Sequence, residues 1–372
     1  MKSATRNYGI DLLRIVSMLA IVTMHILGHG GAISTSDIPV NTFIATMLES
    51  LCSPAVNCFI LVSGFVGFRN EHYFPKLRNL VKLFFQVVFY GFVINAVMKV
   101  LHPDQVGFSA VLGPLLPVSN DVYWFFTCYF AMFILSPLVN YFVHKADRNM
   151  IFMTVVVIFF FGIYEVFSDP FMFQRGFHFA WFVFMYTLGA IIKKLNIIEK
   201  ASNRKCLICI GICTVITWLP RLIPAYFWVP VLNVAIYQKM LDSYCSPTVI
   251  FMAVSVICLF GKIKINPSSF ATHIISFLST AAFSVYLIHD NTLVRKFWIA
   301  GHFTFLTDSN PFLMVIEIIL SAGAIYLVCT LIDYVRGLIF RLLKIEKLSE
   351  WIERLAKCFI AKITGRLQNM VE

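Results

Sequence analysis

Residues 10–25 read IDLLRIVSMLAIVTMH, an apolar stretch that contains three ionisable side chains, Asp11, Arg14 and His25. The run extends to about Gly30, and a helix of about 20 residues is enough to cross the hydrocarbon core of a bilayer. An ionisable group inside such a span is costly unless it faces a cavity or a partner. The stretch is therefore predicted to be a transmembrane helix whose charged residues are candidates for function.

The rest of the chain has the same apolar character. Hydrophobic residues make up 59% of the 372 residues and charged residues 13%, whereas soluble domains contain roughly 45–50% and about 25%. Block lengths and helix breakers predict an all-α, polytopic transmembrane bundle of about ten spans. These spans lie near residues 10–30, 42–68, 80–101, 121–143, 150–168, 178–193, 206–220, 246–260, 273–291 and 311–340. Residues 220–245 are apolar but contain three prolines, so they could be a span, a re-entrant segment or an interfacial segment.

The distribution of Lys and Arg predicts the orientation, because cytoplasmic loops of membrane proteins are enriched in both. With both termini in the cytoplasm, 23 of the 30 basic residues lie on the cytoplasmic side and six on the other. After the last span, residues 344–368 carry apolar side chains three or four apart among charged ones, which predicts an amphipathic helix on the inner leaflet. We therefore divide the chain into a transmembrane domain, 1–343, and a basic cytoplasmic tail, 344–372.

Composition also argues against two other classes of protein. The net charge of +11 could suggest nucleic acid, but basic residues between apolar blocks indicate membrane topology instead of a nucleic-acid surface. Most of the ten cysteines lie inside apolar spans, whereas structural zinc sites need paired, reachable thiolates. We expect no nucleic-acid partner and no metal.

Arg14 and His25 form the most informative pair in the first span. They are eleven residues apart, which in a helix is three turns plus about 20°, so they share one face and lie about 16 Å apart along the axis. A histidine can take a proton from a hydroxyl nucleophile, and an arginine can hold a phosphate or carboxylate. In the simpler interpretation, Arg14 reaches the inner headgroups and His25 bonds a neighbouring helix.

The same pair resembles the hallmark of membrane-bound acyltransferase family 3, an arginine followed by ten residues and a histidine in the first span. Other short motifs resemble the family in the same order along the chain. They are Val62-Ser63-Gly64-Phe65, Tyr123-Trp124-Phe125, Ser136-Pro137 and Ser284-Val285-Tyr286-Leu287-Ile288-His289.

The resemblance implies an enzyme that transfers an acyl group, usually acetyl, from cytoplasmic acyl-coenzyme A to a hydroxyl of a glycan or lipid-linked sugar. His25 is then the catalytic base or acyl relay, and Arg14 is its supporting cation. Arg78 and Lys82 stand in a basic loop that resembles the family's arginine-rich entry to the third span, although Asn79 and Lys82 replace common arginines. Arg14, Arg78 and Lys82 are the candidates for binding coenzyme A.

Two residues near the predicted outer surface, Trp124 and His289, are candidates for binding the acceptor. The alternative for Trp124 is an interfacial aromatic belt, and the alternative for His289 is a structural role. For Arg78 and Lys82, the alternative to coenzyme A binding is ordinary positive-inside anchoring. The expected location is the bacterial plasma membrane, with membrane lipids, a cell-envelope polysaccharide acceptor and proteins of polysaccharide synthesis as partners. The competing functions are a transporter or flippase of a lipid-linked glycan and a receptor-like protein without turnover.

Overall fold

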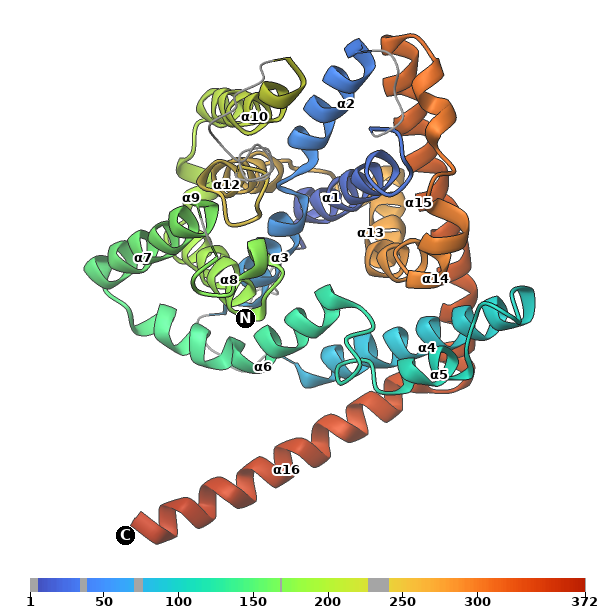
Figure 1. The fold of residues 1–372 in the computed structure, drawn as a ribbon. Helices are drawn as coiled ribbons and strands as arrows, with labels where there is room; N and C mark the ends of the chain where they lie inside the picture. The colour runs from blue at the N-terminus through green and yellow to red at the C-terminus, as the bar shows by residue number, and fades with distance from the viewer. Residues whose placement is uncertain (1–5, 34–38, 70–75, 168, 227–240, 372) are drawn as a thin grey trace.

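The computed structural model describes residues 6–33, 39–69, 76–167, 169–226 and 241–371. Within these ranges the chain is all-α and contains no strand, as predicted. The elements, drawn in Figure 1, are α1 (Tyr8–Leu27), α2 (Pro39–Cys52), α3 (Ala55–Gly67), α4 (Leu77–Leu101), α5 (Phe108–Leu112), α6 (Trp124–Lys145), α7 (Arg148–Phe167), α8 (Phe179–Lys194), α9 (Ile197–Lys200), α10 (Asn203–Tyr226), α12 (Pro247–Gly261), α13 (Phe270–His289), α14 (Thr292–Val294), α15 (Pro311–Leu342) and α16 (Ile345–Val371).

Seven helical segments in the described ranges are long and apolar enough to cross a membrane, and α12 is a shorter apolar helix. The predicted ten spans and the cytoplasmic position of both termini stay predictions. One predicted span, 42–68, is divided into α2 and α3 at Ser53 and Pro54. Proline lacks the N–H that a continuous helix needs at that point, which explains the break. Most of the ambiguous segment 220–245 lies outside the described residues.

Helix α1 is the central element of the bundle. It packs against α2, α3, α12, α13 and α15 (Figure 1). The helix begins at an N-cap, Asn7, whose side-chain oxygen accepts hydrogen bonds from the backbone N–H groups of Gly9 and Ile10. The amide nitrogen of Asn7 donates to the carbonyl oxygen of Gly261 at 2.8 Å, so the cap also ties α1 to the end of α12. Below, the end at which α1 begins is called the N-terminal end of the bundle.

Helices α3 and α8 approach each other so closely that each needs a glycine at the contact. A Cβ atom at Gly64 would collide with the carbonyl oxygen of Tyr186, and one at Gly189 would collide with that of Leu61. Small residues allow such close approach of two helices. Inside lipid, where the hydrophobic effect does not drive helices together, this close van der Waals packing stabilises their contact. The Ser-Gly-Phe motif of the sequence therefore has a packing role at Gly64.

A buried polar network joins α4, α13 and α15. The carboxylate of Asp333 accepts hydrogen bonds from Tyr90 at 2.8 Å, from Arg336 at 2.7 Å and from Ser284. Gln86 in turn donates to the Ser284 hydroxyl. Because no water can satisfy these groups inside a bilayer, their mutual bonds fix the relative position of the three helices.

We expect Gly64→Val to destabilise the protein, because the added side chain meets backbone instead of a flexible side chain. We expect the free energy of unfolding to fall by about 3 kcal/mol, the upper end of the usual range for overpacking. The matched control is Gly323→Val in α15, where nothing lies within 4 Å of an added Cβ. Thermal unfolding and size-exclusion chromatography of both variants in detergent measure the effect. Equal stability of the two variants would contradict the close α3–α8 contact.

Candidate functional site

Three cavities follow one face of α1 from its N-terminal end to the loop beyond it. Arg14 lines the first cavity, Met18 and Ile21 line the second, and His25 lines the second and the third. Positions 14, 18, 21 and 25 are three or four residues apart, so they lie on one face of the helix. One helix thus presents a cation at one end of a row of cavities and an imidazole near the other end.

The first cavity, here called the arginine cavity, lies at the N-terminal end of the bundle and has a volume of about 210 Å³. Three cations line it: Arg14 of α1, Arg69 after α3, and Lys76 before α4. The Ser63 and Tyr129 side chains add hydroxyl groups. Cations and hydroxyls together suit a phosphate or carboxylate ligand, because both supply hydrogen-bond donors to its oxygens.

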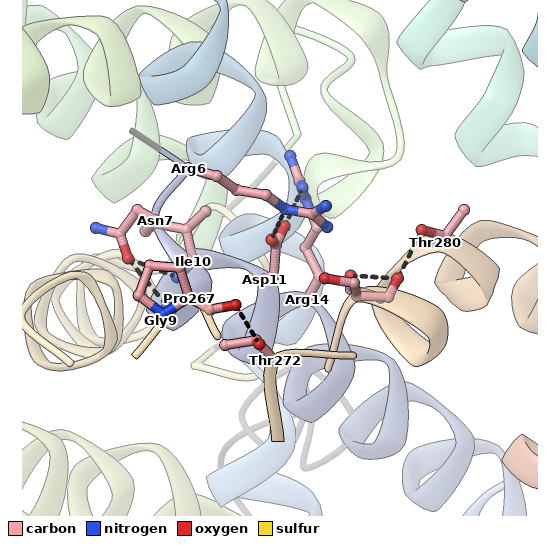
Figure 2. A network of polar contacts seen from close by, with 11 residues as sticks. Arg6, Asn7, Gly9, Ile10, Asp11, Arg14, Pro267, Thr272 and Thr280 are labelled. Carbon is pink, nitrogen blue, oxygen red and sulfur yellow. Dashed lines mark hydrogen bonds and ion pairs between the residues drawn. The ribbon is translucent and has the colours of Figure 1, made fainter. Parts of the chain in front are cut away.

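Asp11 holds Arg14 beside the arginine cavity. The carboxylate of Asp11 accepts from Arg14 Nη1 at 2.9 Å and from Arg6 Nε at 2.5 Å, as Figure 2 shows. Asp11 is only 3% exposed, whereas 33% of the Arg14 side-chain surface remains exposed. Two arginines share one carboxylate, so this cluster carries a net positive charge and can still attract an anion.

The second cavity, here called the apolar cavity, is small and lined mostly by apolar and aromatic side chains, with His25 and Asp290 as its ionisable residues. Its volume is about 40 Å³, which leaves room for only a few heavy atoms. Val56 and Phe59 of α3 and Phe125 of α6 are among the residues that line it. The ring of Phe125 stacks on that of Tyr129 at a centroid distance of 6.3 Å, and Tyr129 lines the arginine cavity. This ring pair therefore lies between the two cavities.

The third cavity, here called the polar cavity, lies at the opposite end of the bundle and has a volume of about 400 Å³. Charged residues of both signs line it, namely Glu49, Arg175, Asp242, Asp290 and Arg295. The Arg175 backbone has φ 60°, a left-handed conformation that is uncommon for a residue with a side chain and often marks a functional site.

Ion pairs cross the polar cavity and its wall. Arg221 of α10 lies 2.7 Å from Glu49 and 3.3 Å from Asp242. Arg295 lies 3.2 Å from Asp290. Arg221 thus connects α10 to α2 and to the segment before α12, whereas the Arg295–Asp290 pair lies within the segment after α13.

Aromatic rings form another part of the wall between the apolar and polar cavities. Trp124 and Tyr244 line both cavities, and their rings are nearly parallel at a centroid distance of 6.5 Å. Phe177 packs against Trp124 at 4.4 Å. The sequence places Trp124 in an aromatic belt or in an acceptor site, and the structure puts it beside His25 at the junction of the two cavities.

The hydrogen bonds of His289 determine which nitrogen of His25 carries a proton when both rings are neutral. His289 Nδ1 lies 2.6 Å from the carbonyl oxygen of Val285, which can only accept, so Nδ1 is the protonated nitrogen. His289 Nε2 is then an acceptor, and it lies 3.0 Å from His25 Nδ1. His25 therefore donates through Nδ1, and its Nε2 keeps a free lone pair.

The turn after His289 is fixed by further polar contacts. Asn291 donates to the Tyr123 hydroxyl at 3.0 Å and to the side-chain oxygen of Asn95 at 3.1 Å. Asp290 Oδ1, held by this turn, lies 3.6 Å from His25 Nδ1. An imidazole with an oriented ring and a carboxylate nearby has the arrangement of a general base.

His25, His29 and Asp290 could also be considered as metal ligands. Their ligand atoms lie within 4.8 Å of one another. Two of these groups already have partners, because Asp290 pairs with Arg295 and His25 bonds to His289. The cluster therefore fits proton transfer better than metal binding, and the expected absence of a metal stays a prediction.

Arg78 and Lys82 do not line the arginine cavity. Arg78 Nη1 is 3.0 Å from Glu350, and Lys82 Nζ is 2.5 Å from Glu346, so both contact helix α16. Lys82 lines a different pocket, on the side of the bundle. Of the three residues predicted to bind coenzyme A, the structure therefore places only Arg14 in the row of cavities with His25.

Sequence reasoning did not select Glu49, Arg175, Tyr244 or Arg295 as site residues. Arg175 and Arg295 do belong to the small group of basic residues predicted on the outer side. Their predicted position on the outer side could have identified them, because basic residues are rare there and topology does not explain their presence. Glu49 and Tyr244 gave no comparable signal.

Comparison with known proteins identifies the family of the chain. The chain matches the model of a family described as an acyltransferase domain over residues 7–334, a range that includes α1, all three cavities and most of α15. Searches of curated proteins and of solved structures gave no significant match. Since the family match covers most of the chain, the protein belongs to acyltransferase family 3 and is a multi-pass membrane acyltransferase.

Proposed function

We propose that this protein transfers an acetyl group from acetyl-coenzyme A to a hydroxyl of a cell-envelope sugar, with His25 as the general base. The observation that carries this proposal is the position of His25 between the apolar and polar cavities, in line with Arg14 in the arginine cavity. The donor and the acceptor then approach His25 from opposite ends of the bundle.

The arginine cavity supports binding of the donor at the N-terminal end. Arg14, Arg69 and Lys76 provide positive charge, and coenzyme A carries several phosphates. The thin pantetheine arm reaches the apolar cavity when the Phe125–Tyr129 ring pair moves apart. If the N-terminal end is cytoplasmic, as the basic residues predict, it faces the compartment in which acyl-coenzyme A is made.

The polar cavity supports a sugar as the acceptor. Glu49, Asp242 and Asp290 can accept hydrogen bonds from sugar hydroxyls, and Trp124 and Tyr244 offer ring surfaces. A cavity of about 400 Å³ is within the range of small-molecule sites. These features fit a glycan or lipid-linked sugar of the bacterial plasma membrane.

The proposed reaction uses the free lone pair of His25. Nε2 removes the proton from the acceptor hydroxyl as its oxygen attacks the thioester carbonyl. The carbon–sulfur bond then breaks, and the coenzyme A thiolate leaves and takes up the proton. His289 acts as a positioning residue, because its Nε2 accepts a hydrogen bond from the Nδ1–H group of His25 and so selects the tautomer.

The size of the apolar cavity supports acetyl as the group transferred. A volume of about 40 Å³ beside His25 holds a two-carbon acyl group and leaves little room for a longer chain. Phe59 limits this volume from the side of α3.

We expect His25→Ala to lower the rate of acetyl transfer about 10²–10⁴-fold, the usual contribution of a general base. The assay measures loss of radiolabelled acetyl from acetyl-coenzyme A and release of free coenzyme A by membranes containing the protein. The control is His273→Ala, which removes an exposed histidine of α13. Full activity of His25→Ala would disprove the base role, and no thioester consumption by the wild-type protein would favour a glycan transporter.

His289→Ala should lower kcat by roughly one to two orders of magnitude, because His25 loses the acceptor that orients it. In His289→Gln the side-chain oxygen can still accept a hydrogen bond from His25 Nδ1–H, so this variant should retain more activity and a pH–rate profile closer to that of the wild type. Equal kcat values and pH profiles for the two variants would show that His289 has only a packing role.

Phe59→Ala should enlarge the apolar cavity and allow longer acyl donors. We expect the rate with butyryl-coenzyme A, relative to acetyl-coenzyme A, to rise by about tenfold or more. Phe152→Ala serves as the control, since Phe152 is 66% exposed on α7 and lies outside the three cavities. An unchanged donor preference would mean that the apolar cavity does not hold the acyl group.

A further inference from the structure

A fourth cavity, here called the lateral pocket, lies at the N-terminal end of the bundle between α4, α13, α15 and α16, and its volume is about 620 Å³. Five basic residues line it, and one acidic residue, Glu346, accompanies them. The basic residues are Lys82, Arg336, Arg341, Lys344 and Lys347. The pocket therefore carries an excess of positive charge that the acyl-transfer reaction does not use.

Two of the five cations already have carboxylate partners. Arg336 is bonded to Asp333 at 2.7 Å, and Lys82 contacts Glu346. The bond from Lys82 lowers the pKa of Glu346, which stays charged. Arg341, Lys344 and Lys347 form no ion pair with any residue in the described ranges, so they provide the charge for a ligand.

Helix α16 builds one wall of the lateral pocket. The helix leaves the end of α15 and passes beside α4 before it extends from the bundle (Figure 1). Glu346 and Glu350 of α16 pair with Lys82 and Arg78 of α4 and hold the wall in place. In the turn between α15 and α16, Lys344 has a left-handed backbone with φ 52°. A residue in this conformation commonly follows the last turn of a helix, and here it places the end of α15 beside the lateral pocket.

The remaining walls are apolar and lie beside surface that faces lipid. Leu83, Phe340 and Ile345 line the lateral pocket together with the cations. Leu342, one turn beyond Leu338 on α15, is 81% exposed, as expected for a residue in contact with lipid chains. A free phosphate needs only cations, whereas cations next to apolar walls suit a phosphate that is attached to acyl chains.

We propose that the lateral pocket binds the headgroup of an anionic phospholipid of the leaflet at the N-terminal end. The phosphate contacts Arg341, Lys344 and Lys347, and the glycerol and first acyl carbons contact Phe340 and Leu83. This inference is independent of the proposed acyl transfer, because the lateral pocket and the arginine cavity share only Asn79 among the described residues that line them.

The experiment compares lipid binding to the full-length protein in detergent by native mass spectrometry, with phosphatidylglycerol and phosphatidylcholine as probes. The test variant is Arg341→Gln/Lys347→Gln. The matched control is Arg354→Gln/Lys357→Gln, which removes the same charge from α16 at positions outside the lateral pocket. We expect the wild type to prefer phosphatidylglycerol, the test variant to bind it roughly tenfold more weakly, and the control to bind like the wild type.

Two further measurements make the result decisive. Lys344→Gln removes one charge and should weaken binding of phosphatidylglycerol less than the double substitution. Thermal unfolding should be similar for all variants, because none of the three residues pairs with a carboxylate of the described chain.

Specific outcomes would overturn the proposal. Equal loss in the test and control variants would mean general attraction of lipid to a basic helix. Displacement of phosphatidylglycerol by coenzyme A, together with weaker coenzyme A binding in the test variant, would assign the pocket to the donor substrate. Displacement by inorganic phosphate alone would indicate a site for free anions.

Discussion

The structure depends on one constraint, which is that polar groups inside a bilayer must be satisfied by the protein itself. The backbone meets this constraint by forming helices. The ionisable side chains of α1 meet it differently at each end: Arg14 shares the buried Asp11 with Arg6, and His25 bonds to His289. Each of these contacts costs the conformational freedom of the side chains that form it, and each leaves a functional group in a defined orientation beside a cavity.

The same constraint separates the chemistry along α1. Charged groups gather in the arginine and polar cavities, where ion pairs and hydroxyls surround them, while the apolar cavity between them has few polar atoms. A low-dielectric region next to His25 strengthens its hydrogen bond to His289 and keeps bulk water from the proposed thioester. The Phe125–Tyr129 ring pair lies at this separation, since Phe125 lines the apolar cavity and Tyr129 lines the arginine cavity.

The sequence was sufficient for features that depend on local periodicity. The all-α architecture, most of the helix positions and the shared face of Arg14 and His25 follow from spacing within single segments. The pairing of His25 with His289 joins residues 264 positions apart, and the polar cavity combines Glu49, Arg175 and Arg295 from separate segments. One sequence contains no direct information on such contacts. The break at Ser53 and Pro54 had a local signal in the proline, but the apolar run around it favoured one long span.

The basic residues at the start of α4 give one topological signal in the sequence but make different contacts in the structure. In the sequence, Lys76, Arg78 and Lys82 form one basic loop and one topological signal. At the start of α4 they separate: Lys76 lines the arginine cavity, Arg78 pairs with α16, and Lys82 lines the lateral pocket. Arg78 and Lys82 are four positions apart, so they share a face of α4 and both contact α16, whereas Lys76 precedes the helix and lines the arginine cavity. Neighbours in sequence can therefore serve different ligands.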